Sequence, residues 1–143
     1  MNRSLIAILA LLIAVLSGAC GHLREGAAPD EVSGLYKGDW YGPNPDRSLG
    51  KLDCSIVRKD AETWDATFSA TFGGFGEYDV NLAGRRVGDT VVFEGSIDLG
   101  ETSGGVFDWN GEIIGDQFNG SYTSKFINGT FRMVKQSPET SVE

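Results

Sequence analysis

The chain has little of the chemistry from which most enzyme sites are built. It contains one histidine, His22, and two cysteines, Cys20 and Cys54. His22 lies in a polar stretch near the N-terminus, so we expect no Ser-His-Asp triad and no Cys-His pair around it. A structural zinc site takes four Cys or His ligands, more than the whole chain holds. The residue counts therefore argue against nucleophilic catalysis and against a zinc centre.

Carboxylates are plentiful, but their spacing does not favour a paired acid–base site. Where apolar and polar residues alternate, the acids fall on the polar side, which indicates a solvated face. These acids are Asp53, Asp65, Asp79, Glu94, Asp98, Asp108 and Glu112. No run has the alternating Asp or Asn residues, closed by an acid, that a calcium loop needs. We therefore expect a protein that is not an enzyme, with no catalytic residues, no metal site and no cofactor.

The chain also lacks an excess of basic residues. It has 12 Lys and Arg against 20 Asp and Glu, which gives a formal net charge of −8. The basic doublets Arg58-Lys59 and Arg85-Arg86 are not part of a longer basic stripe. Because nucleic-acid backbones are bound mainly through basic side chains, we expect no nucleic-acid partner.

No apolar run is long enough for a permanent transmembrane helix, which needs about 20 residues. The longest run, residues 5–16, has twelve residues and follows a single positive charge at Arg3. Small residues come next, at Ser17, Gly18 and Ala19, and then Cys20. A basic start, a short apolar core and a small-residue cleavage region are typical of an export signal peptide. We expect residues 1–19 to be removed.

The residues from Ser17 to Cys20 resemble the lipobox of bacterial lipoproteins. In that family the matching cysteine thiol receives a diacylglycerol, and the chain is cut just before it. The resemblance implies lipidation at Cys20 and a lipid-anchored protein of the bacterial cell envelope, with the outer membrane favoured and the domain in the periplasm or outside. Since the chain is acidic, we expect acyl chains such as palmitate, and not the protein surface, to contact the membrane.

Ser17 departs from the commonest lipobox, which has Leu three residues before the cysteine. Small residues at Ser17 and Ala19 also fit ordinary signal peptidase, which would leave a secreted protein with an unmodified Cys20. In a secreted protein, Cys20 and Cys54 could pair as a disulfide. If Cys20 is acylated, Cys54 is a lone thiol, and it lies between Leu52 and Ile56 on one face of an alternating stretch. We expect it to be a small buried hydrophobe of the core.

The mature chain divides into three parts. Residues 20–33 are polar, contain Gly, Ala and Pro, and show no period, so we expect a lipidated N-terminus and a flexible tether. Residues 34–136 are long enough for one small domain. Residues 137–143 are expected to form a disordered tail.

Strict alternation of apolar and polar residues predicts an all-β domain. Residues 63–72 are the clearest example, with Trp64, Ala66 and Phe68 on one face and threonines, serine and aspartate on the other. The same pattern, bounded by turn residues, predicts eight antiparallel strands at 35–42, 51–59, 63–72, 77–82, 90–99, 106–113, 118–124 and 130–135. A turn is expected at Ala83-Gly84, and another at Gly88-Asp89.

Eight short strands in sequence favour an up-and-down barrel, with an open β-sandwich as the alternative. Glycines on the apolar face fit the sharp coiling of a small barrel. They are Gly38, Gly95, Gly111 and Gly120. The G-x-W motif from Gly38 to Trp40 on the first strand resembles that of lipocalins and the similar avidin-type barrels, which implies a barrel that is either filled or holds one small ligand.

Side chains alternate between the two faces of a strand. This alternation, called strand parity below, places most aromatic residues on the inward face of the barrel. The inward set is Tyr36, Trp40, Trp64, Phe68, Phe72, Tyr78, Phe93, Phe107, Trp109, Phe118, Tyr122 and Phe131. So many rings favour a filled interior, whereas the inward glycines and alanines favour some space. Too few inward polar groups exist for biotin, so any ligand should be apolar.

Two further aromatics, Phe75 and Phe126, fall in turns at the end opposite the N-terminus. We expect both rings to fold back and plug the barrel, with a mobile lid or a partner contact as the alternative. The candidate ligand-binding residues are Tyr36, Trp40, Phe75, Trp109 and Phe126.

Two hypotheses follow. One is an anchored lipocalin-like barrel that binds a small apolar ligand at the end away from the anchor. The other is a non-enzymatic structural or interaction lipoprotein with a filled barrel that binds an envelope protein by its surface.

Overall fold

The computed structural model describes residues 30–71 and 77–138. They form eight β-strands and a short 3₁₀ turn, η2 (Glu101–Ser103). The strands are β1 (Gly34–Tyr41), β2 (Ser48–Arg58), β3 (Thr63–Thr71), β4 (Glu77–Val87), β5 (Thr90–Asp98), β6 (Val106–Ile114), β7 (Gln117–Ser124) and β8 (Asn128–Lys135). The prediction of an all-β fold with eight strands is confirmed.

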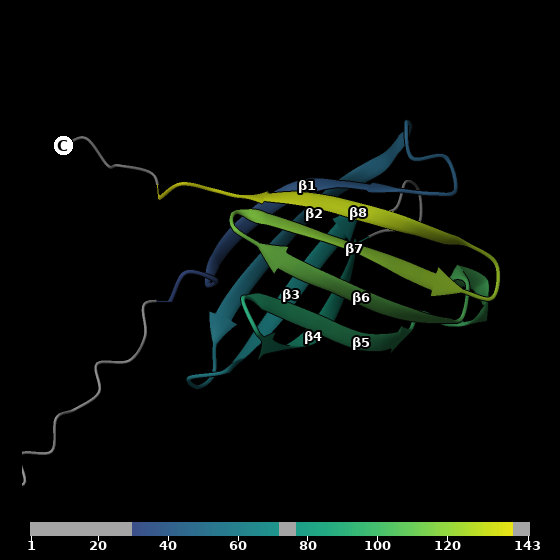
Figure 1. Ribbon diagram of the computed structural model, residues 1–143. Coiled ribbons are helices and arrows are strands. Elements are labelled where there is room, and N and C mark those ends of the chain that lie inside the picture. The colour runs from purple at the N-terminus through teal and green to yellow at the C-terminus, as the bar shows by residue number, and fades with distance from the viewer. Residues whose placement is uncertain (1–29, 72–76, 139–143) are drawn as a thin grey trace, which may run out of the picture.

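The strands close into a single antiparallel barrel. Each strand pairs with the next one along the chain, and β8 returns to pair with β1, as Figure 1 shows. The closing register runs from Tyr36 opposite Lys135 to Tyr41 opposite Thr130. Closure satisfies the backbone groups of both outer strands, which an open sheet would leave exposed at its edges. The predicted up-and-down barrel is correct, and the sandwich alternative is wrong.

Period-two alternation governs which side chains are buried. On β2, Leu52, Cys54 and Ile56 are almost inaccessible to solvent, whereas the residues between them are exposed. The expectation of a buried Cys54 is confirmed, and burial raises the pKa of its thiol far above the ordinary value. The thiolate is therefore not populated near neutral pH, and Cys54 acts as a core residue.

Strand β4 is longer than the sequence predicts. We placed its end near Leu82 and a turn at Ala83-Gly84, but the strand continues to Val87. Gly84 lies opposite Phe93, and a side chain at Gly84 would collide with that ring. The glycine therefore makes room for an aromatic side chain on the neighbouring strand, and the turn follows at Gly88, where φ is +62°.

The start of β2 is also earlier than predicted. The strand begins at Ser48 instead of residue 51, after a register shift between Trp40 and Tyr41 on β1. The boundaries predicted for the signal peptide, the tether and the C-terminal tail stay predictions, because those segments lie wholly or largely outside the described residues.

Inward glycines serve the packing of rings and strands. A side chain at Gly111 would collide with the rings of Phe118 and Phe131, and one at Gly38 would collide with the backbone of β8. We expected such glycines to leave space inside the barrel. Instead, neighbouring rings and backbone occupy the space that a side chain at these positions would need.

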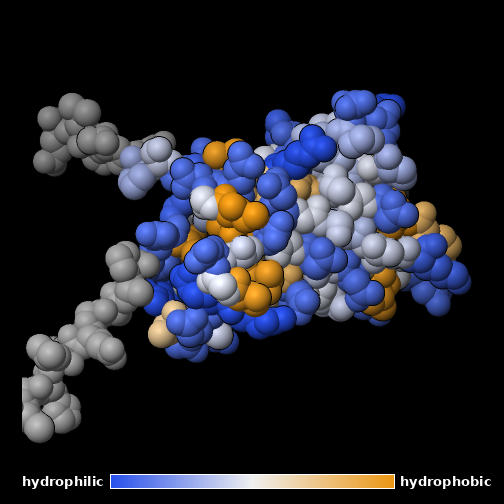
Figure 2. Space-filling view, viewed as in Figure 1, coloured by the Kyte–Doolittle hydropathy of each residue, from blue (hydrophilic) through white to orange (hydrophobic). Residues whose placement is uncertain are grey.

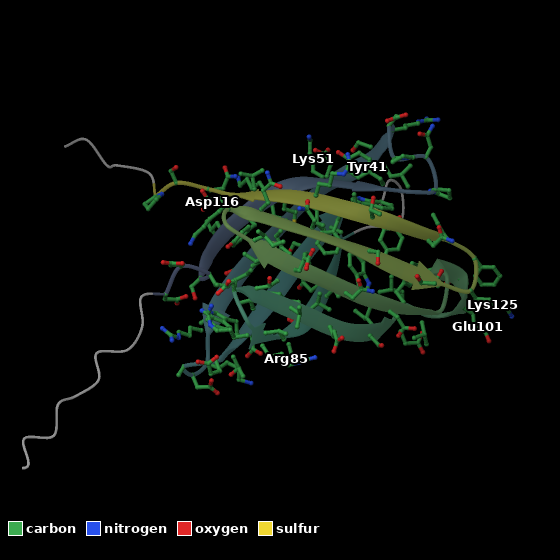
Figure 3. The ribbon with its side chains drawn as sticks, viewed as in Figure 1. Tyr41, Lys51, Arg85, Glu101, Asp116 and Lys125 are labelled. Carbon is green, nitrogen blue, oxygen red and sulfur yellow. The ribbon has the colours of Figure 1, made fainter. Side chains whose placement is uncertain are left out.

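The two ends of the barrel are joined differently. At the base, where the described chain enters β1 and leaves β8, the connections are residues 59–62, 88–89 and 115–116. At the mouth, the described loops are residues 42–47, 99–105 and 125–127. In Figure 1 the base lies on the left and the mouth on the right. Figure 3 labels Asp116 at the base, and Glu101 and Lys125 at the mouth.

Among the described residues, no helix has the length and apolar character required to cross a bilayer. The apolar run 5–16 lies outside them.

Candidate functional site

The lower half of the barrel, toward the base, is filled by aromatic rings. Phe118 is the hub, with ring centroids 5.0 Å from Phe93, 5.3 Å from Phe68 and Phe131, and 5.9 Å from Tyr36. These five side chains are entirely inaccessible to solvent. Ring pairs at such distances contribute stability beyond the area that they bury. The rings around Phe118 therefore occupy this half of the interior.

The base is closed by the segment that precedes β1. The Trp64 indole Nε1 donates a hydrogen bond of 3.2 Å to Asp30 Oδ1, and the Tyr36 hydroxyl donates one of 2.8 Å to the Val32 carbonyl. Burial alone would raise the pKa of Asp30, but hydrogen bonds from Ser33, Trp64 and Val32 outweigh it and lower the pKa to about 2. The ionised carboxylate therefore fixes this closing segment in place.

Two guanidinium groups cover the same indole. The Cζ atoms of Arg58 and Arg86 lie 5.6 Å and 5.2 Å from the Trp64 ring, within the range of a cation–π contact. Arg86 also forms an ion pair with Glu62 at 3.7 Å. The base is thus sealed by Trp64 and by the polar groups around it.

The upper half contains a cavity that opens at the mouth. Its volume is about 210 Å³, and its wall is almost entirely apolar. Strands β1, β3, β4, β6 and β7 and the loops at the mouth all contribute to it. The lining residues are Trp40, Ala70, Val80, Leu99, Thr102, Ser103, Gly104, Phe107, Trp109, Tyr122 and Ile127.

Aromatic rings form one side of this cavity. Tyr122 packs 5.1 Å from Trp109, 6.0 Å from Trp40 and 6.2 Å from Phe107, measured between ring centroids. Its hydroxyl donates a 2.7 Å hydrogen bond to the Tyr41 carbonyl, and burial raises the pKa of Tyr122 to about 12. The hydroxyl is therefore protonated and already engaged, so Tyr122 presents ring carbon to the cavity.

Trp109 brings one polar group to the same region. Its indole Nε1 is buried and has no hydrogen-bond partner within the described part of the chain. A buried donor without a partner costs free energy. A ligand or water that offers this N–H an acceptor atom would remove that cost. Trp109 thus contributes its ring to the apolar wall of the cavity and holds a buried N–H group without a partner among the described residues.

Of the five candidate ligand-binding residues, the structure brings two together at this cavity. Trp40 and Trp109 both line it. Tyr36 does not, since its hydroxyl points to Val32 at the base, and the expectation that Tyr36 belongs to the same site is corrected. Phe75 lies outside the described residues. Whether the two tryptophans contact a ligand stays a prediction.

Phe126 contradicts the expected plug. Its side chain is 71% exposed, and the ammonium of Lys125 lies 5.5 Å from its ring. The ring therefore lies outside the barrel, because the short β7–β8 loop turns Ile127, not Phe126, toward the cavity. The corresponding expectation for Phe75 falls outside the described residues.

Sequence reasoning missed several lining residues. Thr102, Ser103 and Gly104 come from the loop around η2, where no periodicity tells which side chains point inward. Leu99, Val80 and Ala70 continue the inward parity of β5, β4 and β3, so a count along each strand would have found them.

The outer surface matches its prediction. All seven alternating acids of β2 to β6 are exposed. Two of them accept a hydrogen bond from a serine on the adjacent strand: Asp79 from Ser69 at 2.8 Å, and Asp108 from Ser96. No cluster of three or more potential metal ligands occurs among residues 30–71 and 77–138.

Comparison with known proteins supports the fold alone. No protein-family model matches the chain, and no curated protein matches its sequence. Among solved structures, a redesigned β-barrel superimposes with a TM-score of 0.53 at 12% identity, covering 74% of this chain and 91% of that one.

Two other barrels superimpose more loosely. A variant of the fluorescent protein UnaG has a TM-score of 0.45 at 13% identity, covering 76% of this chain and 98% of its own. Fatty-acid-binding protein 1 of Echinococcus granulosus has a TM-score of 0.42 at 8% identity, covering 75% and 98%. Neither overlay is tight enough to carry a conclusion about this chain's ligand.

Proposed function

We propose that this protein is a lipid-anchored component of the bacterial cell envelope whose barrel binds a small apolar molecule at its mouth. The observation that carries the ligand-binding part is the apolar cavity between Trp40, Phe107 and Trp109. Pockets of this kind, apolar with a few polar groups, are the usual form of small-molecule sites. The sequence suggests no Ser-His-Asp triad, no Cys-His pair and no paired carboxylates, which fits a binding protein better than an enzyme.

The size of the cavity limits the ligand. Its volume of about 210 Å³ exceeds the roughly 150 Å³ of an engineered apolar cavity that holds benzene. It is smaller than the roughly 300–1,000 Å³ of pockets that enclose drug-sized molecules. The ring cluster around Phe118 blocks any deeper extension. We therefore propose a ligand of one or two fused rings, or the end of an acyl chain, and not a long fatty acid enclosed from end to end.

Support for the anchor comes from the sequence and from the orientation of the barrel. Cys20 directly follows a signal-like segment, and a cysteine in that place is rare by chance. The described chain begins at the base, so an anchor at Cys20 would leave the mouth facing away from the membrane. A ligand could then reach the cavity from the aqueous side.

The ligand proposal is tested by titrating the protein with 2-naphthol, followed by probe fluorescence. We expect saturable binding, reduced at least about tenfold by Ala70→Phe, because Ala70 lines the cavity and a benzyl group there would occupy it. Ala83→Phe on β4 is the matched control, since Ala83 is exposed on the outer face. Thermal unfolding of both variants checks that they remain folded.

Two results would overturn the ligand proposal. Absence of saturable 2-naphthol binding by a folded protein would favour a filled barrel. Binding that Ala70→Phe leaves unchanged would place the probe outside this cavity.

The anchor is tested by incorporation of labelled palmitate in a bacterial host that expresses the full chain. We expect the label on the wild-type protein and on Cys54→Ser, and none on Cys20→Ser. Because Cys54 is buried and is the other cysteine of the chain, it is a suitable control. Label retained by Cys20→Ser, or absent from the wild type, would refute lipidation at Cys20.

A second candidate function rests on Phe126. Phe126 is 71% exposed at the mouth, and aromatic side chains often anchor contacts between proteins. In that case Phe126→Ala would abolish capture of an envelope partner and leave 2-naphthol binding unchanged, which separates the two functions.

A further inference from the structure

We propose that the base of the barrel is a membrane-contact surface that rests on the phospholipid bilayer. The occupant is the bilayer itself, and the proposal rests on the anchoring at Cys20 proposed above. It goes further than anchoring, since it assigns a contact to the folded domain. From the sequence we expected acyl chains alone to touch the membrane. The distribution of apolar and charged side chains on the described barrel argues for a second contact.

The first argument is a rim of exposed aliphatic side chains around the base. Five strand ends carry one each, with 48–61% of the residue exposed. The rim consists of Leu35, Val57, Val87, Ile114 and Val134. All five project outward, where they bury nothing within the barrel. Isolated exposed aliphatics are common on soluble proteins, but a repeated placement at one end forms a surface.

The second argument is that four of the five rim residues lie on the same side of the barrel, on β6, β8, β1 and β2. Gln117 on β7 pairs with Ile114 on one side and with Val134 on the other. Beyond β8, Leu35 at the start of β1 pairs with Ser55, two residues before Val57 on β2. Ile114, Val134, Leu35 and Val57 therefore lie along one side of the base, with polar residues such as Gln117 and Ser55 between them. Figure 2 shows apolar patches at the base end of β6 to β8.

The third argument is charge. The segments that form the base, residues 30–35, 57–63, 85–91, 113–117 and 134–136, contain five bases and six acids. The remaining described residues contain five bases and eleven acids. The base is thus nearly neutral, whereas the rest of the barrel is strongly acidic. Since bacterial membranes carry anionic lipid, the base is the part of the surface that they repel least.

The fourth argument is reach. Only residues 20–29 separate Cys20 from the first described residue, Asp30. Ten residues span at most about 35 Å when fully extended, and less in any other conformation. The mouth lies roughly 20 Å farther from that attachment point, by the rise and tilt of barrel strands. A lipid on Cys20 therefore keeps the whole barrel within reach of the bilayer, and the base is the part nearest to the attachment point.

Strand β6 offers a matched pair of positions for the test. Ile114 is 59% exposed at the base end, and Val106 is 52% exposed at the mouth end of the same strand. Ile114→Cys and Val106→Cys are each labelled with a nitrobenzoxadiazole fluorophore. The buried Cys54 thiol does not compete for the label. The lipidated proteins are reconstituted into vesicles of phosphatidylcholine with one part in five phosphatidylglycerol and a spin-labelled lipid quencher.

We expect quenching at position 114 several-fold stronger than at position 106. Equal quenching at the two positions would overturn the proposal, because a barrel that tumbles freely on its tether exposes both ends alike. The palmitate experiment separates this failure from loss of the anchor: palmitate incorporation with equal quenching refutes the contact surface alone.

A second measurement removes the anchor. All eight strands lie within residues 34–135, so a chain that starts at position 20 with Cys20→Ser retains the whole barrel. Titrated with the same vesicles, it should still be quenched more at position 114 than at 106. Val57→Ser combined with Val134→Ser should weaken this partition about tenfold, whereas Leu49→Ser combined with Val106→Ser should not. Equal effects of the two pairs would also contradict the proposal.

Discussion

The base half and the mouth half of the barrel are made from the same alternating strands, but they enclose different interiors. Around Phe118 the rings interlock and Gly111 is in contact with two of them. Around Trp109 a similar set of rings leaves a cavity of about 210 Å³. Base connections have two to four residues, whereas the described mouth loops have three to seven. Tight turns bring strand ends together over a core, and longer loops leave the opposite ends apart.

The strongest way to break this comparison is to remove a ring from each half. Phe118→Ala should lower the free energy of unfolding by about 3–5 kcal/mol, since Phe118 is inaccessible and contacts four other rings. Phe107→Ala should lower it by about 3 kcal/mol or less, at or below the lower end of the same range, because one side of the Phe107 ring lines the cavity. Urea unfolding followed by fluorescence measures both. Equal losses would mean that the two halves are packed alike.

Adding volume to each half tests the same difference from the other side. Ala66 and Ala70 lie on the same face of β3, four residues apart. Ala66→Leu should lower the free energy of unfolding by about 1–3 kcal/mol, since Ala66 is inaccessible between Ile56 and Leu82. Ala70→Leu should change it by less than about 1 kcal/mol, because its side chain extends into the cavity. A larger loss for Ala70→Leu would contradict the cavity.

The hydrogen bonds that close the base predict a pH dependence. The pKa of Asp30 is lowered from 3.8 to about 2, so its contribution to stability is present above pH 4 and is lost as pH falls toward 2. We expect about 1 kcal/mol, well below the value for the full shift, because the carboxylate is exposed and screened by solvent. Unfolding curves of wild type and Asp30→Asn should converge between pH 4 and pH 2. A constant difference would indicate that the Asp30 charge does not contribute.

The smallest effect is expected at the outer side of the mouth. Phe126→Ala should change the free energy of unfolding by less than about 0.5 kcal/mol, since the ring is mostly exposed. A loss above about 1 kcal/mol in the urea experiment would show that the ring packs against the barrel in solution, as the sequence had led us to expect.

Strand parity made most of the fold predictable. Residues 63–72 and the run Leu52, Cys54 and Ile56 alternate so strictly that their inward faces follow from the sequence alone. The end of β4 did not follow, because Ala83-Gly84 has the composition of a turn. The reason for a glycine there is Phe93 on the neighbouring strand, and such a partner cannot be found from local sequence.

The candidate site was only partly predictable, for a related physical reason. Parity states whether a side chain points inward, but not how far along the barrel axis it lies. Trp40 and Tyr36 share an inward face of β1, yet one lines the cavity and the other seals the base. Their positions along β1 would have separated them, because Tyr36 lies near the base end of the strand and Trp40 near the mouth end. In loops, parity fails altogether, which is why Thr102 and Phe126 could not be placed.

The pairing of β1 with β8 has a consequence for how the protein reaches its native state. Every other pairing joins neighbours in the sequence, so seven hairpins can form one after another while the chain is being synthesised. The eighth pairing joins Tyr36 to Lys135 and waits for the last strand. Until then both outer strands are unpaired templates for association with other chains. A truncation that removes β8 should therefore produce aggregates and not a smaller barrel, and the closing step should set the rate of folding.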